Sequence, residues 1–336
     1  MQKNNQKDAF YFQWHFMENC NLRCIHCYQN NYEADHLPID KLLEIAQSLN
    51  GAMAKWKKNG RVSLTGGEPF LKPELLFMLL DYFEKAKNFY WIGLLSNGTL
   101  IDNEIAKKLT KYKKISEIQI SIDGASEETH DKIRGKNSFQ KAVSAIKILK
   151  SKGIYTSIMF TLHEKNKDEV TPMLDLAVEI GVDAITIERI TPMSSDDITE
   201  FYMQPEELRV VYNQIYKKKI AIEKKSNLKI RVSRPLWTLI DSNLGGFCPA
   251  GLTSLSILQD GTVLPCRRLE IPIGNILTDG LYKIWYKSDV LWRLRNKENL
   301  TGKCNNCKFI HACGGCRAIA HTINNDFMAE DPQCWL

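Results

Sequence analysis

The sequence predicts an α/β fold in which a partial (β/α)6 barrel is followed by a small cysteine-rich α+β domain. From residue 10 to about residue 190, short β-rich runs alternate with amphipathic helical patterns, and after about residue 225 this alternation stops. The ten cysteines fall into two groups, with three near the N-terminus and seven in the last ninety residues. We therefore expect a barrel domain over 1–225 and an auxiliary domain over 226–336.

Six β-rich runs are each followed by a helical pattern. The strands are expected at Tyr11–Phe16, Arg61–Leu64, Trp91–Leu95, Glu117–Ile122, Tyr155–Phe160 and Ala184–Glu188. The helices are expected near 39–57, 73–87, 102–112, 138–152, 168–180 and 205–223. Such alternation forms parallel units with right-handed crossovers, and six units suit an open, TIM-like barrel. In barrels of this kind the chemistry lies on the loops after the strand C-termini.

The second domain is expected to begin with a β-hairpin. Two β-rich runs, Ser254–Leu258 and Thr262–Pro265, flank the turn residues Asp260-Gly261. A short helix is expected around Leu281–Tyr286, and the cysteine-rich tail follows it.

Composition and charge indicate an ordinary globular protein. The 336 residues are 44% hydrophobic and 25% charged, with a formal net charge of +6. This mild charge does not require a nucleic-acid partner. No apolar run approaches the roughly 18 residues that span a bilayer, and the polar segment Met1–Asp8 contains no signal-peptide core. We expect a cytoplasmic protein, in which ten cysteines are poorly explained as disulfides because the cytosol keeps thiols reduced.

The first cysteine group, Cys20, Cys24 and Cys27, directly follows the first strand. Three thiolates on a short loop can hold three irons of a 4Fe–4S cube and leave the fourth iron for another ligand. The same spacing fits three core cysteines on one helix face, and with His26 it also fits a zinc site. The pattern favours an iron–sulfur cluster and leaves both alternatives open.

The motif Cys20-Asn-Leu-Arg-Cys24-Ile-His-Cys27-Tyr28 resembles the signature of the radical S-adenosylmethionine (SAM) superfamily, and Gly66-Gly67-Glu68-Pro69 resembles its Gly-Gly-Glu-Pro motif. The resemblance implies that SAM chelates the open iron and that an electron from the cluster cleaves SAM to a 5′-deoxyadenosyl radical. It also implies that Gly66, Gly67 and Glu68 receive the SAM amino group, since glycines allow close approach and a carboxylate suits an ammonium. Alone, this motif is equally compatible with a plain strand–helix turn.

Further motifs follow later strands in the order found in this family. Ser96-Asn97-Gly98-Thr99 resembles its ribose-side loop, and Ser121 and Arg134 resemble the serine and arginine that bind the SAM ribose and carboxylate. His26, within the signature, is implied to join these SAM-binding residues. Asn97-Gly98 is also a common turn, and Arg134 is also compatible with a solvated charge at a helix end.

Seven tail cysteines resemble the SPASM extension of radical SAM enzymes, which binds two auxiliary 4Fe–4S clusters. The resemblance assigns Cys304, Cys307, Cys313 and Cys334 to a distal cluster and Cys248, Cys266 and Cys316 to a proximal one. Two residues separate Cys313 from Cys316, whereas three are usual at this place in the family.

A zinc ribbon is the alternative for the tail. It uses similar Cys-x2-Cys pairs, but it would leave three of the seven tail cysteines without a metal. Two cubes need eight thiolates, so one auxiliary iron lacks a cysteine ligand, and three clusters are expected in all.

The resemblance implies an enzyme that abstracts hydrogen from a ribosomally made peptide or protein, with the auxiliary clusters relaying electrons during oxidation or cross-linking. A flavodoxin- or ferredoxin-type protein is the expected reductant. The chain begins almost at its first strand, so we expect no N-terminal peptide-recognition domain. The alternative is a small-molecule enzyme of the haem or haem d1 type, since Gly314–Ala318 and Ala329–Pro332 resemble the tails of those enzymes. A protein that only carried electrons is not expected, because it would need no SAM-binding motif.

Overall fold

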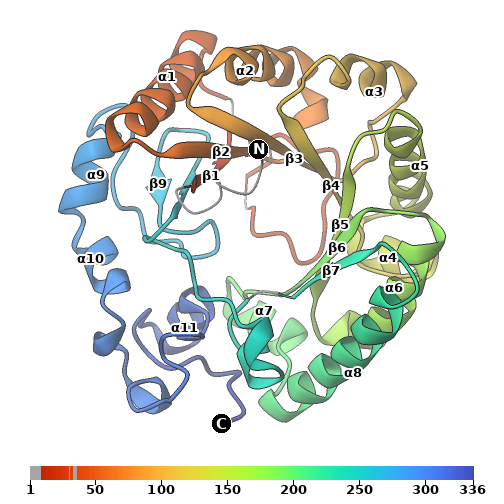
Figure 1. Ribbon diagram of the computed structural model, residues 1–336, viewed down its shortest axis with the longest axis vertical. Helices are drawn as coiled ribbons and strands as arrows, with labels where there is room; N and C mark the ends of the chain where they lie inside the picture. The colour runs from red at the N-terminus through yellow and green to blue at the C-terminus, as the bar shows by residue number, and fades with distance from the viewer. Residues whose placement is uncertain (1–8, 30, 33–35, 233) are drawn as a thin grey trace.

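One curved sheet forms the framework of the protein. The computed structural model describes residues 9–29, 31–32, 36–232 and 234–336, so the polar segment Met1–Asp8 lies outside the described residues. The nine strands follow the order β7-β6-β5-β4-β3-β2-β1-β8-β9, and the sheet curves around a central space with helices on its outer face (Figure 1). The predicted partial barrel is confirmed.

The first seven strands run parallel, each paired with its neighbour in the sequence. They are β1 Ala9–His15, β2 Asn59–Thr65, β3 Phe89–Ser96, β4 Ile115–Ser121, β5 Thr156–Leu162, β6 Ala184–Arg189 and β7 Lys229–Arg231. The six predicted strands correspond to β1 to β6. The additional strand, β7, has only three residues, which is too short to show an alternating pattern in the sequence.

The six predicted barrel helices are also present. They correspond to α1 Ile39–Trp56, α2 Pro73–Lys85, α3 Asn103–Leu109, α5 Ser138–Ser151, α6 Val170–Glu179 and α8 Pro205–Glu223. The unpredicted helices are α4 Glu127–Arg134, α7 Ser195–Phe201, α10 Asp289–Arg295 and α11 Arg317–Asn324. The start of α4 does carry a signal, because the Ser126 side chain accepts the Thr129 N–H and two glutamates occupy the first turn.

Alternation along the strands separates the hydrophobic core from the barrel interior. On β1, Phe10, Phe12 and Trp14 are buried, whereas Tyr11 and Gln13 are half-buried. Successive side chains of a strand point to opposite faces, and the helices cover the face that carries the buried set. The other face lines the interior, where several side chains keep partial solvent contact. A closed eight-stranded barrel would instead be filled by side chains.

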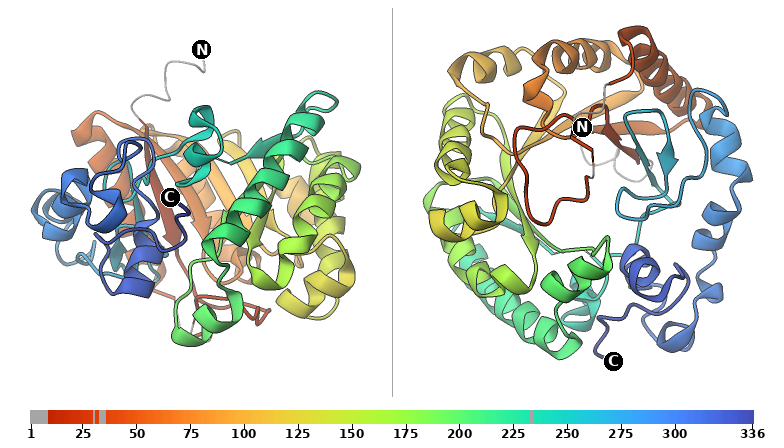
Figure 2. Two further views of the ribbon diagram at one scale, coloured as in Figure 1. Left: turned by 90° about the horizontal axis from the view of Figure 1, so that it is seen from below. Right: turned by 180° about the vertical axis from the view of Figure 1, so that it is seen from behind.

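The predicted hairpin is confirmed and extends the same sheet. Strand β8, Ser254–Ile257, pairs in parallel with β1 and antiparallel with β9, Val263–Leu264. In the turn Gly261 has a φ of +85°, and the Thr262 N–H donates to the Asp260 carboxylate. The sheet therefore continues past the domain boundary expected near residue 225. The tail, with α9 Leu281–Lys287, α10 and α11, occupies the side where the sheet is open (Figure 2).

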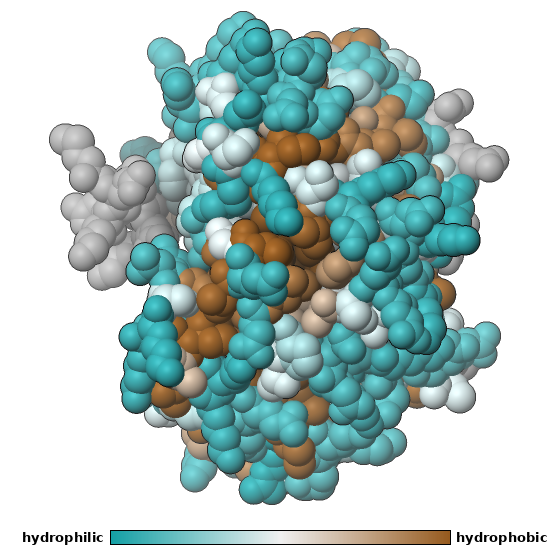
Figure 3. Space-filling view, turned by 90° about the vertical axis from the view of Figure 1, so that its right-hand side faces the viewer, coloured by the Kyte–Doolittle hydropathy of each residue, from teal (hydrophilic) through white to brown (hydrophobic). Residues whose placement is uncertain are grey.

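One face of the molecule shows the outer surface of the barrel helices (Figure 3). Seen from the side of the outer barrel helices, it is mostly hydrophilic around a narrow hydrophobic band (Figure 3). Within the described ranges, no helix is both long and apolar enough to cross a bilayer.

Candidate active site and cluster sites

The first cysteine group lies on a loop without helix that follows β1 and, seen along the barrel, lies within the outline of the ring formed by the sheet and the tail (Figure 2, right). The Cys27 N–H donates to the Cys24 carbonyl at 3.1 Å, and the Arg23 guanidinium donates to the Cys20 carbonyl at 2.8 Å. Because residues 16–29 form no helix, the alternative of three core cysteines on one helix face is wrong.

The thiols of this loop receive hydrogen-bond donors. The Gln29 N–H lies 3.5 Å from Cys27 Sγ, and Arg134 Nη1 lies 3.9 Å from Cys24 Sγ. Burial raises the pKa of Cys24 to about 11 although the Arg134 charge opposes this. Donors aimed at sulfur stabilise thiolate ligands of a cluster, so the loop fits an iron–sulfur group. Among the residues described, no three His, Cys, Asp or Glu side chains are grouped around a single metal-ion position.

Gly66 and Gly67 let two loops pack backbone to backbone. A Cβ at Gly66 would lie 2.2 Å from the Met17 carbonyl oxygen, and one at Gly67 would lie 2.1 Å from the Asn19 carbonyl oxygen. The Gly67 and Glu68 N–H groups donate to these same carbonyls at 3.0 and 2.8 Å. Both glycines are therefore required where the backbone of the cysteine loop approaches them, and their contact with the SAM amino group stays a prediction.

Glu68 connects the loops after β2 and β3. Its fully buried carboxylate accepts hydrogen bonds from the Phe70 N–H at 3.1 Å, the Ser96 hydroxyl at 2.8 Å and the Asn97 N–H at 2.7 Å. Burial raises the pKa of Glu68 to about 7, against the lowering effect of these donors. The carboxylate thus orders the predicted SAM loop, and its contact with the SAM amino group stays a prediction.

The predicted ribose-side loop also contacts the cysteine loop. Asn97 Nδ2 donates to Asn21 Oδ1 at 3.0 Å, and Asn21 Nδ2 donates to Thr99 Oγ1 at 2.8 Å. The structure therefore brings the motifs after β1, β2 and β3 together at one end of the barrel.

Asp123, which was not among the predicted site residues, organises the other side of the cysteine loop. Arg134 Nε donates to its Oδ2 at 2.5 Å, His26 Nε2 lies 3.2 Å from the same oxygen, and the Thr161 N–H donates to Oδ1 at 2.7 Å. Burial acts to raise the pKa of Asp123, but Arg134 and His26 outweigh it and hold the pKa well below its usual range. Arg134 is buried, so the alternative of a solvated charge at a helix end is wrong.

Two histidines present unpaired nitrogens beside this group. The rings of His26 and His163 lie 5.6 Å apart, and both His26 Nδ1 and His163 Nε2 are buried without a hydrogen-bond partner. Polar atoms of this kind suit a bound ligand such as SAM. His163 was not predicted as a site residue. Its position directly after β5 is the one feature of the sequence that could have indicated it, because the chemistry of such barrels lies on the loops after the strands. Ser121 ends β4 and is half-buried.

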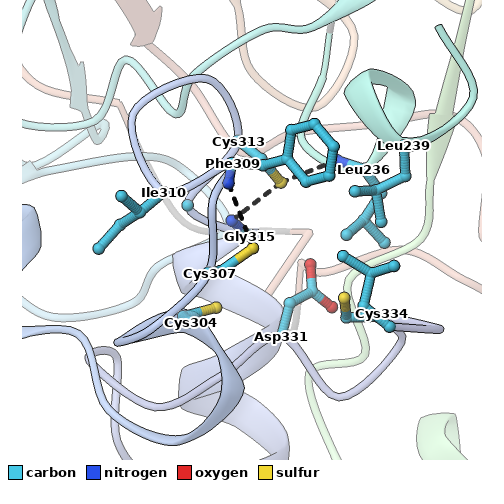
Figure 4. Close-up of a pocket in the computed structure, with 12 residues that line it drawn as sticks. Leu236, Leu239, Cys304, Cys307, Phe309, Ile310, Cys313, Gly315, Asp331 and Cys334 are labelled. Carbon is cyan, nitrogen blue, oxygen red and sulfur yellow. Dashed lines mark hydrogen bonds between the residues drawn. The ribbon is translucent and has the colours of Figure 1, made fainter. Parts of the chain in front are cut away.

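Four tail cysteines line one hollow of about 310 Å³, namely Cys304, Cys307, Cys313 and Cys334 (Figure 4). They are the four assigned to the distal cluster.

Backbone N–H groups point at the sulfurs in this hollow. Phe309 donates to Cys307 Sγ at 3.4 Å, and Gly315 and Leu236 donate to Cys313 Sγ at 3.4 and 3.2 Å. Leu236 does so with a φ of +78°, a strained conformation for a leucine. This donor set fits a thiolate-bound cluster, since hydrogen bonds to sulfur are common in such sites.

The three cysteines assigned to the proximal cluster also lie together. Burial raises the pKa of Cys248 to about 11, and the neighbouring thiols of Cys316 and Cys266 add to this effect. The Cys316 N–H donates to the Asp331 carboxylate at 2.8 Å, and Asp331 is paired with buried Arg189 of β6 at 2.8 Å. The salt bridge between Asp331 and Arg189 thus fixes the backbone at Cys316 against the barrel.

The residues after Cys266 connect this region with the first cysteine loop. The Arg267 guanidinium lies 4.1 Å from the ring centroid of Tyr28, which follows Cys27. The next residue, Arg268, donates to Glu188 of β6 at 2.7 Å. The proximal cysteines are therefore held against both the first cysteine loop and the barrel wall.

Comparison with known families agrees with this arrangement. The sequence model of the radical SAM superfamily matches residues 14–177. This match shows that the barrel contains a radical SAM domain. A second model, the SPASM iron–sulfur cluster-binding domain, matches residues 248–308. This radical SAM enzyme therefore uses SAM and 4Fe–4S clusters, while Cys313, Cys316 and Cys334 lie beyond the matched part of the SPASM domain.

Individual relatives cover almost the whole chain. An AdoMet-dependent heme synthase of Methanosarcina barkeri is 28% identical over 96% of this chain and 95% of its own length. A mycofactocin maturase, MftC, of Mycolicibacterium smegmatis is 27% identical over 96% of this chain and 81% of its own. The crystal structure of Streptococcus suis SuiB bound to the precursor peptide SuiA has the same fold, with a TM-score of 0.78 and 19% identity over 98% of this chain and 76% of that one.

Proposed function

We propose that this radical SAM enzyme abstracts hydrogen from a ribosomally made peptide or protein and that three clusters serve the reaction. The first cluster, when bound, supplies the electron that cleaves SAM to a 5′-deoxyadenosyl radical. The observation that carries the proposal is the contact of Tyr28 with Arg267, which holds the proximal cysteines beside the first cysteine loop.

Each motif of the barrel has a part in binding SAM. Cys20, Cys24 and Cys27 hold three irons and leave one for SAM. Arg134, fixed by Asp123, donates toward Cys24 and offers its remaining guanidinium to the SAM carboxylate.

The loops after β2 and β3 complete this SAM site. Gly66, Gly67 and Glu68 bring their loop against the cysteine loop, and the Glu68 carboxylate fixes Ser96 and Asn97. His26 and Ser121 add polar groups on the remaining side, next to β4.

The tail residues divide into a complete and an incomplete ligand set. Cys304, Cys307, Cys313 and Cys334 supply four thiolates to the distal cluster. Cys248, Cys266 and Cys316 supply three to the proximal one. The proximal set lies beside the barrel wall through Arg268 and Glu188. A cluster held there would accept the electron that the substrate radical loses after hydrogen abstraction. A flavodoxin- or ferredoxin-type protein is the proposed external reductant.

The inward face of the barrel keeps partial solvent contact. Inward-facing positions such as Gln119, Ser121, Met159 and Thr161 are half-buried, while the alternate positions are buried under the helices. The similarity to a mycofactocin maturase and the shared fold with the SuiB–SuiA complex support a peptide substrate. A small-molecule substrate of the haem type is the second candidate, because the similarity to a heme synthase extends over 95% of that relative's length.

The test is an anaerobic reaction of reconstituted enzyme with SAM, a flavodoxin-type reductant and a candidate substrate. Candidates are short peptides encoded beside the gene and an iron porphyrin that carries propionates. Mass spectrometry measures 5′-deoxyadenosine, the mass of the substrate and deuterium transfer from labelled substrate into 5′-deoxyadenosine. We expect deuterium transfer from the peptide. Transfer from the porphyrin alone would replace the peptide proposal by the second candidate, and absence of 5′-deoxyadenosine would refute both.

A further inference from the structure

The barrel interior carries more positive than negative charge. Among the described residues, four arginines meet two glutamates there. The arginines are Arg61, Arg231, Arg234 and Arg268, and the glutamates are Glu117 and Glu188. This leaves a surplus of two positive charges on walls that keep solvent contact.

The surplus is not evenly spread. Arg231 and Glu117 form a one-to-one pair at 2.5 Å, and Arg231 also reaches the Tyr155 hydroxyl at 3.3 Å. Their charges cancel, and this pair needs no further partner.

Two arginines share the other glutamate. Arg234 Nε donates to Glu188 Oε1 at 2.6 Å, and Arg268 Nη2 donates to Oε2 at 2.7 Å. The Glu188 side chain is only 9% exposed, whereas those of Arg234 and Arg268 are 42% and 25% exposed. One carboxylate thus fixes two partly exposed guanidiniums, and Arg268 Nη1 also donates to the Arg189 carbonyl at 3.2 Å. The cluster carries one net positive charge.

Arg61 supplies the second surplus charge. Its guanidinium lies 4.3 Å from the ring centroid of Trp91 and 5.9 Å from that of Tyr11, and no carboxylate of a described residue pairs with it. Its Nε is buried and has no hydrogen-bond partner. Tyr11, Arg61 and Trp91 occupy the same register on β1, β2 and β3, so the aromatic rings hold the guanidinium in place.

By strand alternation Arg61 of β2 and Glu188 of β6 both face the interior, since Arg61 is half-buried and so is Thr186, two positions before Glu188. Burial raises the pKa of Tyr11, and both Arg61 and Arg234 act on the Tyr11 hydroxyl in the opposite direction. Tyr11 itself is fixed by donating to Ser63 at 2.8 Å. A bound anion would therefore meet arginines from two walls of the barrel.

We infer that Arg61, Arg234 and Arg268 form a site in the barrel interior for a carboxylate group of the substrate. An arginine fork matches a carboxylate with two parallel hydrogen bonds, which a lysine or an amide does not. Because Arg268 follows Cys266 by two positions, the carboxylate lies on the side of the interior that adjoins the proximal cysteines. The inference rests on the proposed function and specifies its substrate as acidic.

A carboxylate can come from a peptide side chain or from the propionate of a small molecule, and the probes distinguish the two. The reconstituted holoenzyme with SAM is titrated with coproporphyrin III and with its tetramethyl ester, and separately with pentaglutamate and pentaglutamine. Calorimetry measures each dissociation constant. We expect at least one acidic probe to bind, and its neutral counterpart to bind at least about tenfold more weakly, the factor expected for a charge-assisted hydrogen bond.

Three variants locate the binding site. Arg61→Gln and Arg234→Gln should each weaken the acidic probe about tenfold or more, and Arg61→Lys should recover only part of the loss because it restores charge without the fork. Arg209→Gln is the matched control, since Arg209 is an exposed arginine on the outer helix α8 that pairs with Glu206 at 3.3 Å. It should bind the probe as the wild type does. Circular dichroism and iron content verify that every variant is folded and loaded.

Equal binding of acidic and neutral probes, binding of neither acid, or unchanged binding in Arg61→Gln and Arg234→Gln would each overturn the inference. Binding of coproporphyrin III alone would assign the site to a small molecule, and binding of pentaglutamate alone to a peptide. SAM cleavage by the wild type is measured without any probe. Its absence would refute the proposed function, whereas its presence without a carboxylate preference would refute this inference alone.

Discussion

The first cysteine loop and the tail cysteines are two sites of different construction. Around the first loop, buried charges are abundant: Asp123 pairs with Arg134 and His26, and Glu68 holds two neighbouring loops. Around the distal cysteines, apolar residues such as Leu236 and Phe309 line the hollow, and the donors to sulfur are mostly backbone N–H groups (Figure 4). SAM carries charge and must bind and leave, so it needs a site with charged partners such as the first loop provides. A cluster that stays bound fits the apolar hollow of the tail.

The largest expected effect is the loss of Asp123 from the first site. Asp123→Asn leaves Arg134 buried without its carboxylate, and breaking a buried pair costs on the order of 3–5 kcal/mol. Urea unfolding of the apo-protein measures the change. Glu128→Gln is the control, because Glu128 pairs with Lys132 on the exposed face of α4 and exposed pairs contribute little to stability. Similar losses in both variants would show that Asp123 does not organise the site.

The next effect is a pH dependence that belongs to Glu68. Its folded pKa of about 7 lies above the usual 4.5, so the stability it contributes is complete below pH 4.5 and is lost as the pH rises through 7. The loss amounts to about 3 kcal/mol at most. The free energy of unfolding of the apo-protein should fall from pH 5 to pH 8, and it should fall less in Glu68→Gln. An identical slope in both proteins would contradict the buried environment described for this carboxyl group.

A smaller effect tests the tail. Gly315 has a φ of +62°, donates to Cys313 Sγ, and would place a Cβ 2.6 Å from the Asp331 Cβ. Gly315→Ala should lower the iron bound by the tail and destabilise the protein by about 1–3 kcal/mol. Gly153→Ala is the matched control, with a φ of +72° and open space around its Cβ. It should cost about 1 kcal/mol and leave the iron content unchanged. Equal iron contents in the two variants would show that the contact with Asp331 does not shape the tail site.

The two regions also differ in how far the sequence predicts them. The strands and helices of the barrel follow from local periodicity, and the tail cysteines assigned to each cluster by resemblance do lie together in the structure. The pairing of Asp123 with Arg134 within the first site, and of Arg189 with Asp331 beside the tail, was not predicted. Arg189 and Asp331 are 142 positions apart, and no local pattern records a contact across such a distance.

Gly66 and Gly67 have a structural role that the sequence did not reveal. They were predicted to allow the approach of a ligand, because a glycine permits close contact. In the structure the carbonyl groups of Met17 and Asn19 also require this close approach. Only the fold shows this contact, and the contact of the two glycines with the SAM amino group stays a prediction.

The central claim is that the first loop cleaves SAM while the tail holds its clusters independently. Replacing Cys20, Cys24 and Cys27 together by alanine tests it, with iron and zinc content, Mössbauer spectra and 5′-deoxyadenosine measured on the reconstituted protein. From three cubes we expect about twelve irons in the wild type and about eight in the variant, which should form no 5′-deoxyadenosine. Retained 5′-deoxyadenosine formation in the variant, or about four irons with stoichiometric zinc in the wild type, would contradict the account.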